Sequence, residues 1–341
     1  MQVNPIRISV IVPVHNNPRE LQECLSALQA SACSGSEILV VDDGSTDDVA
    51  SVTARMGVRV LRLAVNSGPA AARNFGAAHA RGDILFFVDA DVVLAPGAVS
   101  RVVQMFREQP GLAAVFGSYD SQPRAQGVVS QYRNLLHHFV HQQGRPDAST
   151  FWAGCGAIRR SVFKEIGVFD EKRFPRSSIE DIELGYRLRG AGYKILLDKA
   201  LQGTHLKHWK LRSVIRTDIT RRAIPWSRLI LESKSAPDDL NLKREQRLSA
   251  GLVLLGTLLV PFAALRVELL ALPAVAFAAM VVLNRGLFVF FLQQRGLRFA
   301  AACIPLHLLY YLYSGLSYLF VWIGWQFKGP ATRPGTTPTS G

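Results

Sequence analysis

Two carboxylates one residue apart, Asp89 and Asp91, follow the apolar run Ile84–Val88 in the first third of the chain. Residues i and i+2 of a strand point to the same face, so both acids should leave the sheet together at its carboxyl edge. Open α/β sheets bind their ligands at that edge. Paired oxygen donors suit Mg²⁺ or Mn²⁺, ions that bridge proteins to substrate phosphates. The pattern therefore indicates a metal and phosphate site, with an ordinary acidic turn after a strand as the alternative.

The segments around this pair alternate between strand-like and helix-like patterns through residues 1–120, which is typical of a doubly wound α/β sheet. The links are short enough that the first two strands should be parallel. The expected strands are Ile6–Val14, Glu37–Val41, Val58–Leu63, Ile84–Val88 and Leu112–Phe116, and the expected helices are Pro18–Ala30, Ala70–Ala80 and Pro96–Glu108.

The rest of the first 210 residues is less regular, with a helix expected at 126–141 and a glycine-bearing strand at Thr150–Arg159. Glycines in a strand allow a ligand to approach the backbone closely. A further helix should begin at Glu180 and Asp181 and be followed by a short strand, Tyr193–Leu197. Acidic residues on a first helical turn are favoured by the helix dipole alone, so this pair has a purely structural explanation as well.

The formal charge is +13, from 39 basic and 26 acidic residues. Such a balance is compatible with nucleic-acid binding, but the chain has no helix-turn-helix, RNA-recognition or zinc-finger pattern. Eleven Lys and Arg against five Asp and Glu gather in residues 201–247, directly before the apolar part of the chain. That position favours anionic lipid headgroups as the partner, and no nucleic acid is expected.

Three apolar segments follow, at 249–265, 267–283 and 299–327, each close to the roughly 20 residues that a membrane-spanning helix needs. A soluble three-helix subdomain is the alternative. The basic loop 285–298 would lie on the cytoplasmic side by the positive-inside rule. We therefore expect a multi-pass protein of the inner membrane with its catalytic part in the cytoplasm.

Before the spans, residues 211–231 place apolar side chains at helical spacing with arginines off that stripe. Such a basic amphipathic helix is typical of the membrane interface, although an ordinary surface helix has the same pattern. Pro225 should kink or end it. The predicted organisation is a catalytic domain at 1–210, an interfacial helix and linker at 211–247, about three transmembrane helices at 248–327 and a disordered tail at 328–341.

Over about residues 6–210, six motifs in this order and at these spacings resemble family 2 glycosyltransferases of the GT-A fold. The motifs are Val10–Asn16, Val40–Asp47, Asn66–Gly68 with Ala72–Asn74, Asp89–Asp91, Trp152–Gly154 and Glu180–Asp181. The resemblance implies an inverting transfer of a sugar from a UDP- or GDP-sugar to an acceptor hydroxyl.

On the donor side, the resemblance implies that Asp42 accepts hydrogen bonds from the nucleotide base. Pro13 and Asn16 would line the same pocket. Arg73, on the first turns of its helix, would meet the diphosphate, because a helix N-terminus and a guanidinium both favour anions.

For the metal, the resemblance assigns Asp91 as a ligand of Mg²⁺ or Mn²⁺, with Asp89 near the ribose or the metal. His205 resembles the family's late histidine, which can complete the metal shell. His208 is a rival for that role, and a packed histidine is the alternative for either.

On the acceptor side, the resemblance makes Asp181 the candidate general base, with Glu180 orienting or assisting it. Trp152 and Gly154 would belong to the acceptor-side segment. Inversion needs one in-line attack, so the base must lie opposite the leaving group.

The chain also departs from one branch of the family. Processive polysaccharide synthases carry a Gln-x-x-Arg-Trp segment, and Arg221–Trp226 does not match it, so processive synthesis is not expected. Polyprenyl-phosphate sugar transferases share the architecture of a GT-A domain with a few helices, which suggests a lipid-linked or glycan acceptor in cell-envelope biosynthesis. A catalytically silent nucleotide-sugar-binding partner of an envelope assembly complex is the alternative function. Dehydrogenases, P-loop enzymes and nucleotidyltransferases would need glycine-rich signatures that are absent.

Overall fold

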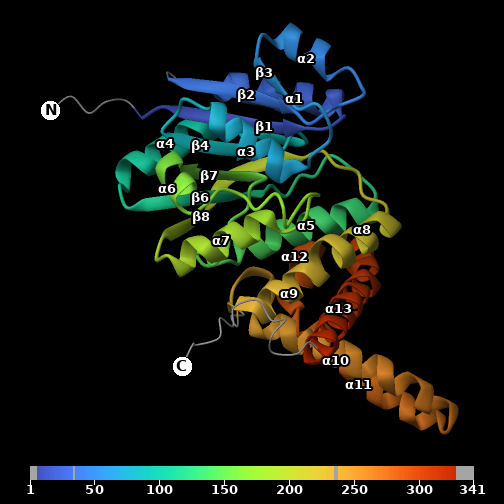
Figure 1. Cartoon of the computed structure of the whole chain (residues 1–341). Helices are drawn as coiled ribbons and strands as arrows, with labels where there is room; N and C mark the ends of the chain where they lie inside the picture. The colour runs from blue at the N-terminus through green and yellow to red at the C-terminus, as the bar shows by residue number, and fades with distance from the viewer. Residues whose placement is uncertain (1–5, 34, 234–236, 328–341) are drawn as a thin grey trace, which may run out of the picture. The chain divides into compact units, whose positions relative to one another are not determined.

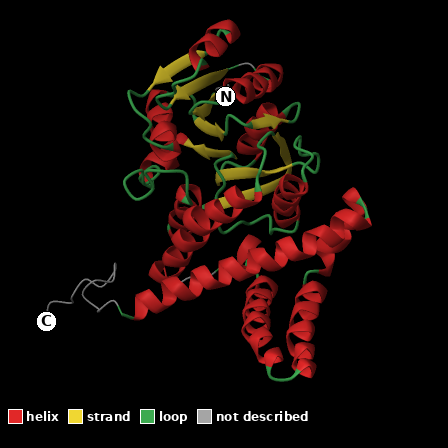
Figure 2. Cartoon of the chain, turned by 90° about the vertical axis from the view of Figure 1, so that its right-hand side faces the viewer, coloured by secondary structure: helices red, strands yellow, loops and turns green. Residues whose placement is uncertain are grey.

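The computed structural model describes residues 6–33, 35–233 and 237–327, and the chain divides into two units (Figure 1). The first unit comprises residues 1–126 and 137–208, and the second comprises 127–136 and 209–341. All strands belong to the first unit, and the second is helical (Figure 2). The tail predicted to be disordered, 328–341, lies outside the described residues.

The first unit is built on a mixed eight-stranded sheet in the order β3-β2-β1-β4-β7-β6-β8-β5. Its strands are β1 (Ile8–Val14), β2 (Ser36–Asp42), β3 (Arg59–Arg62), β4 (Ile84–Val88), β5 (Val92–Leu94), β6 (Leu112–Tyr119), β7 (Cys155–Arg159) and β8 (Lys194–His205). β1 to β4 pair in parallel, and β7 runs antiparallel to both of its neighbours. The strand order reverses between β1 and β4, the position where α/β sheets bind ligands beyond their carboxyl ends.

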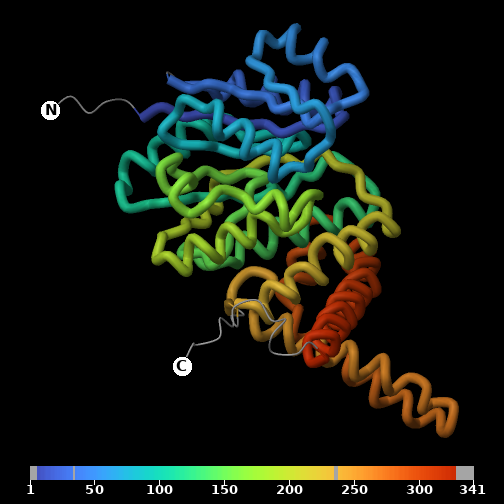
Figure 3. Tube along the Cα trace, viewed as in Figure 1, coloured from blue at the N-terminus to red at the C-terminus, as the bar shows by residue number. Residues whose placement is uncertain are grey.

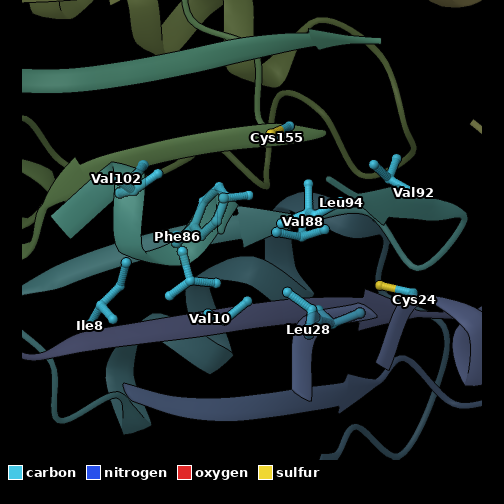
Figure 4. Packing of buried hydrophobic residues seen from close by; sticks show 14 of the residues in the cluster. Ile8, Val10, Cys24, Leu28, Phe86, Val88, Val92, Leu94, Val102 and Cys155 are labelled. Atoms are coloured by element: carbon cyan, nitrogen blue, oxygen red, sulfur yellow. The ribbon is translucent and has the colours of Figure 1, made fainter. Parts of the chain in front are cut away.

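Helices cover both faces of this sheet. They are α1 (Pro18–Ser31), α2 (Val49–Met56), α3 (Pro69–His79), α4 (Ala98–Glu108), α6 (Arg160–Glu165), α7 (Glu180–Gly190) and the later part of α5 (Val128–Gln142). On one face, alternate residues of β1 and β4, among them Val10 and Phe86, form a fully buried cluster with Leu28 of α1 and Val102 of α4 (Figure 4). This packing fixes where the carboxyl ends of the two strands lie.

The opposite face is covered by α3, which approaches the sheet through a glycine. A Cβ added at Gly76 would lie 2.6 Å from Cγ2 of Ile11 and 2.9 Å from Cγ2 of Val41. Only glycine lets the helix backbone lie this close to β1 and β2. The close approach sets the position of α3 and of the arginine that it carries, Arg73.

Several sequence expectations are confirmed. The strand Ile84–Val88 has the predicted bounds at both ends, and the helix α7 begins at Glu180 as predicted. The strand expected at Thr150–Arg159 begins only at Cys155. The strand expected at Tyr193–Leu197 continues to His205 as β8, because its later half pairs with both β6 and β5. The short elements α2, β5 and α6 were not anticipated.

The second unit consists of helices that begin with the first turns of α5. The others are α8 (Leu211–Thr217), a π-helical stretch (Asp218–Ala223), α9 (Ile224–Ser233), α10 (Arg244–Leu259), α11 (Ala271–Leu283), α12 (Arg285–Arg295) and α13 (Leu297–Gln326). Short 3-10 helices at Leu240–Leu242, Val260–Ala264 and Val267–Leu270 precede α10, extend it and precede α11. α10 and α11 lie side by side as a hairpin (Figure 3). Pro225 does not end the basic helix. The preceding π-helical stretch changes the hydrogen-bond register, which accommodates a residue without an N–H donor.

Among the described residues of this unit, two helical segments are long and apolar enough to cross a membrane, Arg244–Ala264 and Leu297–Gln326. A third span is counted if Val267–Leu283 and Arg285–Arg295, bent by 68° at their junction, act as one. Only 17 % of the apolar window in Arg244–Ala264 is buried within the protein. The exposed apolar surface suits contact with lipid rather than water.

The approach of α3 to the sheet gives the first prediction. We expect Gly76→Ala to destabilise the first unit by about 1–3 kcal/mol, because the added methyl group overpacks a β-branched contact. Gly190→Ala is the matched control, since a Cβ at that helical glycine meets no atom within 4 Å. The midpoint of thermal unfolding of the detergent-solubilised chain should fall by several degrees in the first variant and not in the second. Equal midpoints would show that α3 is not held this closely.

Candidate active site

The ends of β1 and β2 form the first part of the site. The two strands are in register with Val14 opposite Asp42, so the Asp42 side chain lies at the carboxyl edge of the sheet. Asp42 is buried, its carboxylate accepts a hydrogen bond from the backbone N–H of Ser45 (2.8 Å), and Nε of Arg62 lies 3.5 Å away. Pro13, predicted to line the base pocket, is buried within β1 opposite Val41.

Asn16 connects the loops that follow these two strands. It has a positive φ of 60°, a conformation that asparagine adopts more readily than most residues. Its side-chain oxygen accepts a hydrogen bond from the N–H of Thr46 (3.0 Å), and its own N–H donates to Oγ of Ser45 (2.9 Å). Asn16 and Asp42 are thus connected through Ser45 at one rim of the sheet.

Asp43 is a residue to which the sequence reasoning gave no role. Its carboxylate accepts hydrogen bonds from the N–H groups of Ser67 (2.7 Å) and Gly68 (2.8 Å), directly before α3. Gly68 has φ +91°, and a Cβ there would lie 2.5 Å from the carbonyl oxygen of Pro175. Asp43 therefore fixes the backbone that leads into α3. The sequence feature that could have indicated this role was its position directly after Asp42.

A buried arginine joins two distant carboxylates at the centre of the site. The Arg73 guanidinium donates from Nη1 to Glu180 (2.9 Å) and from Nη2 to Asp89 (2.7 Å). The Arg73 and Glu180 side chains are 6 % and 4 % exposed, and Asp89 is 33 % exposed. Burial opposes the charge, but the two carboxylates raise the pKa of Arg73, so its guanidinium stays ionised.

Through Arg73, this bridge connects the end of β4 to the start of α7. Arg73 and Glu180 are 107 residues apart in sequence. Arg73 was expected to meet the diphosphate, and both of its terminal nitrogens are occupied by carboxylates. Its Nε is buried and has no hydrogen-bond partner within the part of the chain that is described. The arginine thus fixes the separation between the donor-side acid Asp89 and the acidic start of α7.

Asp91 faces His205 on the other side of the Asp-x-Asp turn. β5 pairs with β8 so that Val92 lies opposite His205, and Nε2 of the histidine is 3.4 Å from Oδ2 of Asp91. Burial opposes ionisation, yet the contact with His205 and the nearby Lys207 lower the pKa of Asp91. His208, the rival to His205, is exposed and lies beyond the end of β8.

A metal site built from protein groups alone is not formed: in the described ranges no three His, Cys, Asp or Glu side chains are close enough to hold an ion. Asp89, the expected third member, is turned to Arg73. Asp91 and His205 nevertheless form an oxygen and nitrogen pair that fits a divalent ion whose other ligands come from a diphosphate, the usual arrangement for Mg²⁺. The ring of His205 is fixed for this by stacking on Tyr119, with ring centroids 4.3 Å apart.

Asp181 lies on the first turn of α7, beside Glu180. Its carboxylate accepts hydrogen bonds from the N–H of Ala153 (3.0 Å) and of Ile182 (2.8 Å). Burial, with the neighbouring charge of Glu180, raises the pKa of Asp181 to about 7. A carboxylate whose pKa lies near neutral pH is suited to accept a proton during catalysis.

A glycine in α7 allows this contact. A Cβ at Gly185 would lie 2.4 Å from the backbone nitrogen of Phe151, so the helix packs directly on the segment that carries Trp152 and Ala153. Gly185 follows Asp181 by one helical turn and faces the same side. Sequence reasoning missed it, although a glycine inside a helix was a usable signal.

The predicted acceptor-side residues Trp152 and Gly154 lie against each other. A Cβ at Gly154 would come within 2.6 Å of the Trp152 indole, and the Gly154 carbonyl accepts a hydrogen bond from the N–H of Asp89 (3.1 Å). The indole also packs edge to face on Tyr119, with ring centroids 4.9 Å apart. Gly154 thus holds both the indole and the Asp-x-Asp turn in place.

The buried bridge gives the second prediction. Arg73→Met should destabilise the chain by about 3 kcal/mol or more, because it leaves two carboxylates without their partner in the interior. Arg124→Met is the matched control, since the Arg124–Glu23 pair is 61 % and 38 % exposed and should contribute less than about 1 kcal/mol. Unfolding by urea would measure both, and similar losses for the two variants would contradict the structural role of the bridge.

Comparisons with known proteins identify the family to which this domain belongs. Residues 9–167 match the family model described as Glycosyl transferase family 2. A pre-mycofactocin glycosyltransferase of Mycobacterium tuberculosis is 30 % identical over 218 residues, which cover 61 % of this chain and 44 % of that protein. An uncharacterized glycosyltransferase of Haemophilus influenzae is 32 % identical over 172 residues, which cover 47 % of this chain and 55 % of that protein.

The solved structure of a mannosyltransferase from Pyrobaculum calidifontis, in complex with GDP-Man and Mn²⁺, shares the fold. It superposes with a TM-score of 0.59 at 18 % identity and covers 92 % of this chain and 87 % of that one. The chain spans about half the length of the curated relatives that it matches. The first unit of the chain is therefore a family 2 glycosyltransferase domain of the GT-A fold.

Proposed function

We propose that the chain is an inverting, metal-dependent glycosyltransferase that moves a sugar from a nucleoside-diphosphate donor to a membrane-associated acceptor. The observation that carries the proposal is the Arg73 bridge, which ties the donor-side Asp89 to the helix turn bearing Asp181. One chain of contacts thus connects the edge that would bind the diphosphate to Asp181, whose pKa lies near 7. An inverting displacement requires those two groups on either side of the sugar.

On the donor side, Asp42 and Asn16 provide oxygen acceptors at the rim where β1 and β2 end. A base with N–H donors, such as uracil or guanine, is the chemistry that such acceptors recognise. The diphosphate would then extend along the carboxyl edge toward Asp91 and His205. A divalent ion held by these two residues would neutralise the charge that develops on the departing nucleoside diphosphate. The relative from Pyrobaculum calidifontis was solved with Mn²⁺, which supports the same class of ion here.

On the acceptor side, Asp181 would take the proton of the attacking hydroxyl as the bond to the anomeric carbon forms. Hydrogen bonds from Ala153 and Ile182 orient its carboxylate. Glu180 is committed to Arg73, so it acts as the positioning residue of the pair and raises the pKa of Asp181 by its charge. The Trp152 indole, held by Gly154, supplies an apolar face beside the base.

The acceptor class is proposed from the second unit. Two or three helices there could cross a membrane, and the segment before them is rich in arginine. We place the catalytic unit on the cytoplasmic side of the inner membrane, since basic loops stay on that side. A lipid-linked or glycan acceptor of the same membrane is therefore the acceptor class that we propose. A silent nucleotide-sugar-binding partner is the second candidate, and turnover on any acceptor excludes it.

The base assignment gives the third prediction. With purified full-length protein, Mn²⁺, lipid extract and a panel of UDP- and GDP-sugars, kcat/KM should rise with pH and level off above about 7, because the ionised form of Asp181 is the active one. Asp181→Asn should lower kcat by about 10²–10⁴ while a thermal shift with donor and Mn²⁺ is retained. Full activity in this variant would contradict the mechanism, whereas loss of the thermal shift would indicate misfolding.

The metal assignment gives the fourth prediction. Asp91→Asn should abolish the stabilisation of the protein by Mn²⁺ with UDP or GDP, and EDTA should do the same to the wild type. Asp83→Asn is the matched control, because Asp83 precedes the opposite end of β4 and is half exposed. Thermal shift measures all three. An undiminished Mn²⁺-dependent shift in Asp91→Asn would place the ion elsewhere.

A further inference from the structure

The helical unit contains a cavity of its own, of about 460 Å³. It lies among the π-helical stretch, α9, α10 and α13, and all of its lining residues belong to the second unit. Three arginines and one aspartate contribute to it, namely Arg133, Arg222, Arg247 and Asp218. Its volume falls in the range of small-molecule sites, which are about 300–1,000 Å³.

The charged residues in the cavity lining carry surplus positive charge, because two arginines contact one aspartate. Asp218 is 3 % exposed, and its carboxylate accepts hydrogen bonds from Arg222 (2.6 Å) and from the Tyr313 hydroxyl (2.6 Å). The Arg133 guanidinium is 3.1 Å from the same carboxylate. Two arginines thus share one acid. The Arg133 side chain is only 16 % exposed, so an anion that enters would gain a desolvated positive partner.

The other walls are apolar and belong to the two candidate membrane spans. Gly251 and Leu254 of α10 face the cavity together with Gly315 and Leu319 of α13. A Cβ at Gly251 would meet no atom within 4 Å, so the space beside α10 is open. Tyr318 of α13, 40 % exposed, also lines the cavity. A molecule that fills it would contact both these charged side chains and a hydrocarbon-like surface.

We propose that this cavity binds one membrane lipid with an anionic, phosphate-type headgroup. The headgroup lies at Arg222 and Arg133, and the chain runs between α10 and α13 along Gly251 and Leu319. The charge excludes a neutral amphiphile as the preferred ligand, and the apolar walls between two candidate spans distinguish a lipid from free phosphate. The inference uses the second unit alone and does not depend on sugar transfer.

Native mass spectrometry of the detergent-solubilised full chain tests the proposal, with phosphatidic acid, phosphatidylcholine and inorganic phosphate as probes. We expect one phosphatidic acid bound per chain at concentrations where phosphatidylcholine is bound about tenfold less, the difference that one charge-assisted contact supplies. Inorganic phosphate should neither bind nor compete. Equal binding of the two lipids, or competition by phosphate, would overturn the proposal.

Two pairs of variants locate the lipid. Gly251→Leu fills the open space and should lower phosphatidic acid binding about tenfold or more. Gly324→Leu is its control, since Gly324 is also a helical glycine of a candidate span with no atom within 4 Å of a Cβ and does not line the cavity. Arg222→Gln should weaken the anionic lipid and leave phosphatidylcholine unchanged. Arg216→Gln, outside the cavity, controls for overall charge.

These comparisons also separate binding in the cavity from general adhesion to the basic surface. Retained binding in both Gly251→Leu and Arg222→Gln would contradict the assignment, as would equal losses in the two controls. A far-ultraviolet circular dichroism spectrum shows whether each variant keeps its helical content. Should Arg222→Gln lose it, Gly251→Leu alone decides, because its side chain enters open space and leaves the Asp218 contacts intact.

Discussion

The site depends on one buried ionic contact, the guanidinium of Arg73 between Asp89 and Glu180. An unpaired charge at this depth would cost several kcal/mol, so each partner holds the others in place. Because Asp89 ends β4 and Glu180 opens α7, the contact sets the distance between the edge that would receive phosphate and the acid that would receive a proton. Glycines on each side, Gly76 under α3 and Gly185 under α7, allow the helices to come close enough for it to form.

The two acids of the Asp-x-Asp turn have separated tasks in this arrangement. Asp89 is neutralised by Arg73 and serves the architecture, while Asp91 faces His205 and is available to a cation. Two adjacent carboxylates aimed at the same point would repel each other in the absence of metal. Turning one of them to an arginine relieves this repulsion in the structure without a bound donor, and in the proposed mechanism phosphates of the donor would supply the remaining ligands.

Much of this was predictable from local sequence pattern. The bounds of β4, the start of α7 and the long apolar helix α13 follow from hydrophobic periodicity and from acidic residues on a first helical turn. The extent of β8 was not predictable, because its polar later half is a strand only through pairing with β5 and β6. The partners of Arg73 could not be predicted from the sequence either. Its place on the first turns of a helix indicates that it binds an anion, but it does not indicate which anion. Asp43 and Gly185 show that residues which hold the site were overlooked because they perform no chemistry themselves.

In the proposed mechanism, Asp181 deprotonates an acceptor on the opposite side of the sugar from the departing nucleoside diphosphate. The anomeric configuration of the first product, followed by proton nuclear magnetic resonance during early turnover, tests this most directly. A single displacement of this kind predicts inversion relative to the donor sugar. Retention of configuration would exclude a single in-line displacement assisted by Asp181 and would contradict the account.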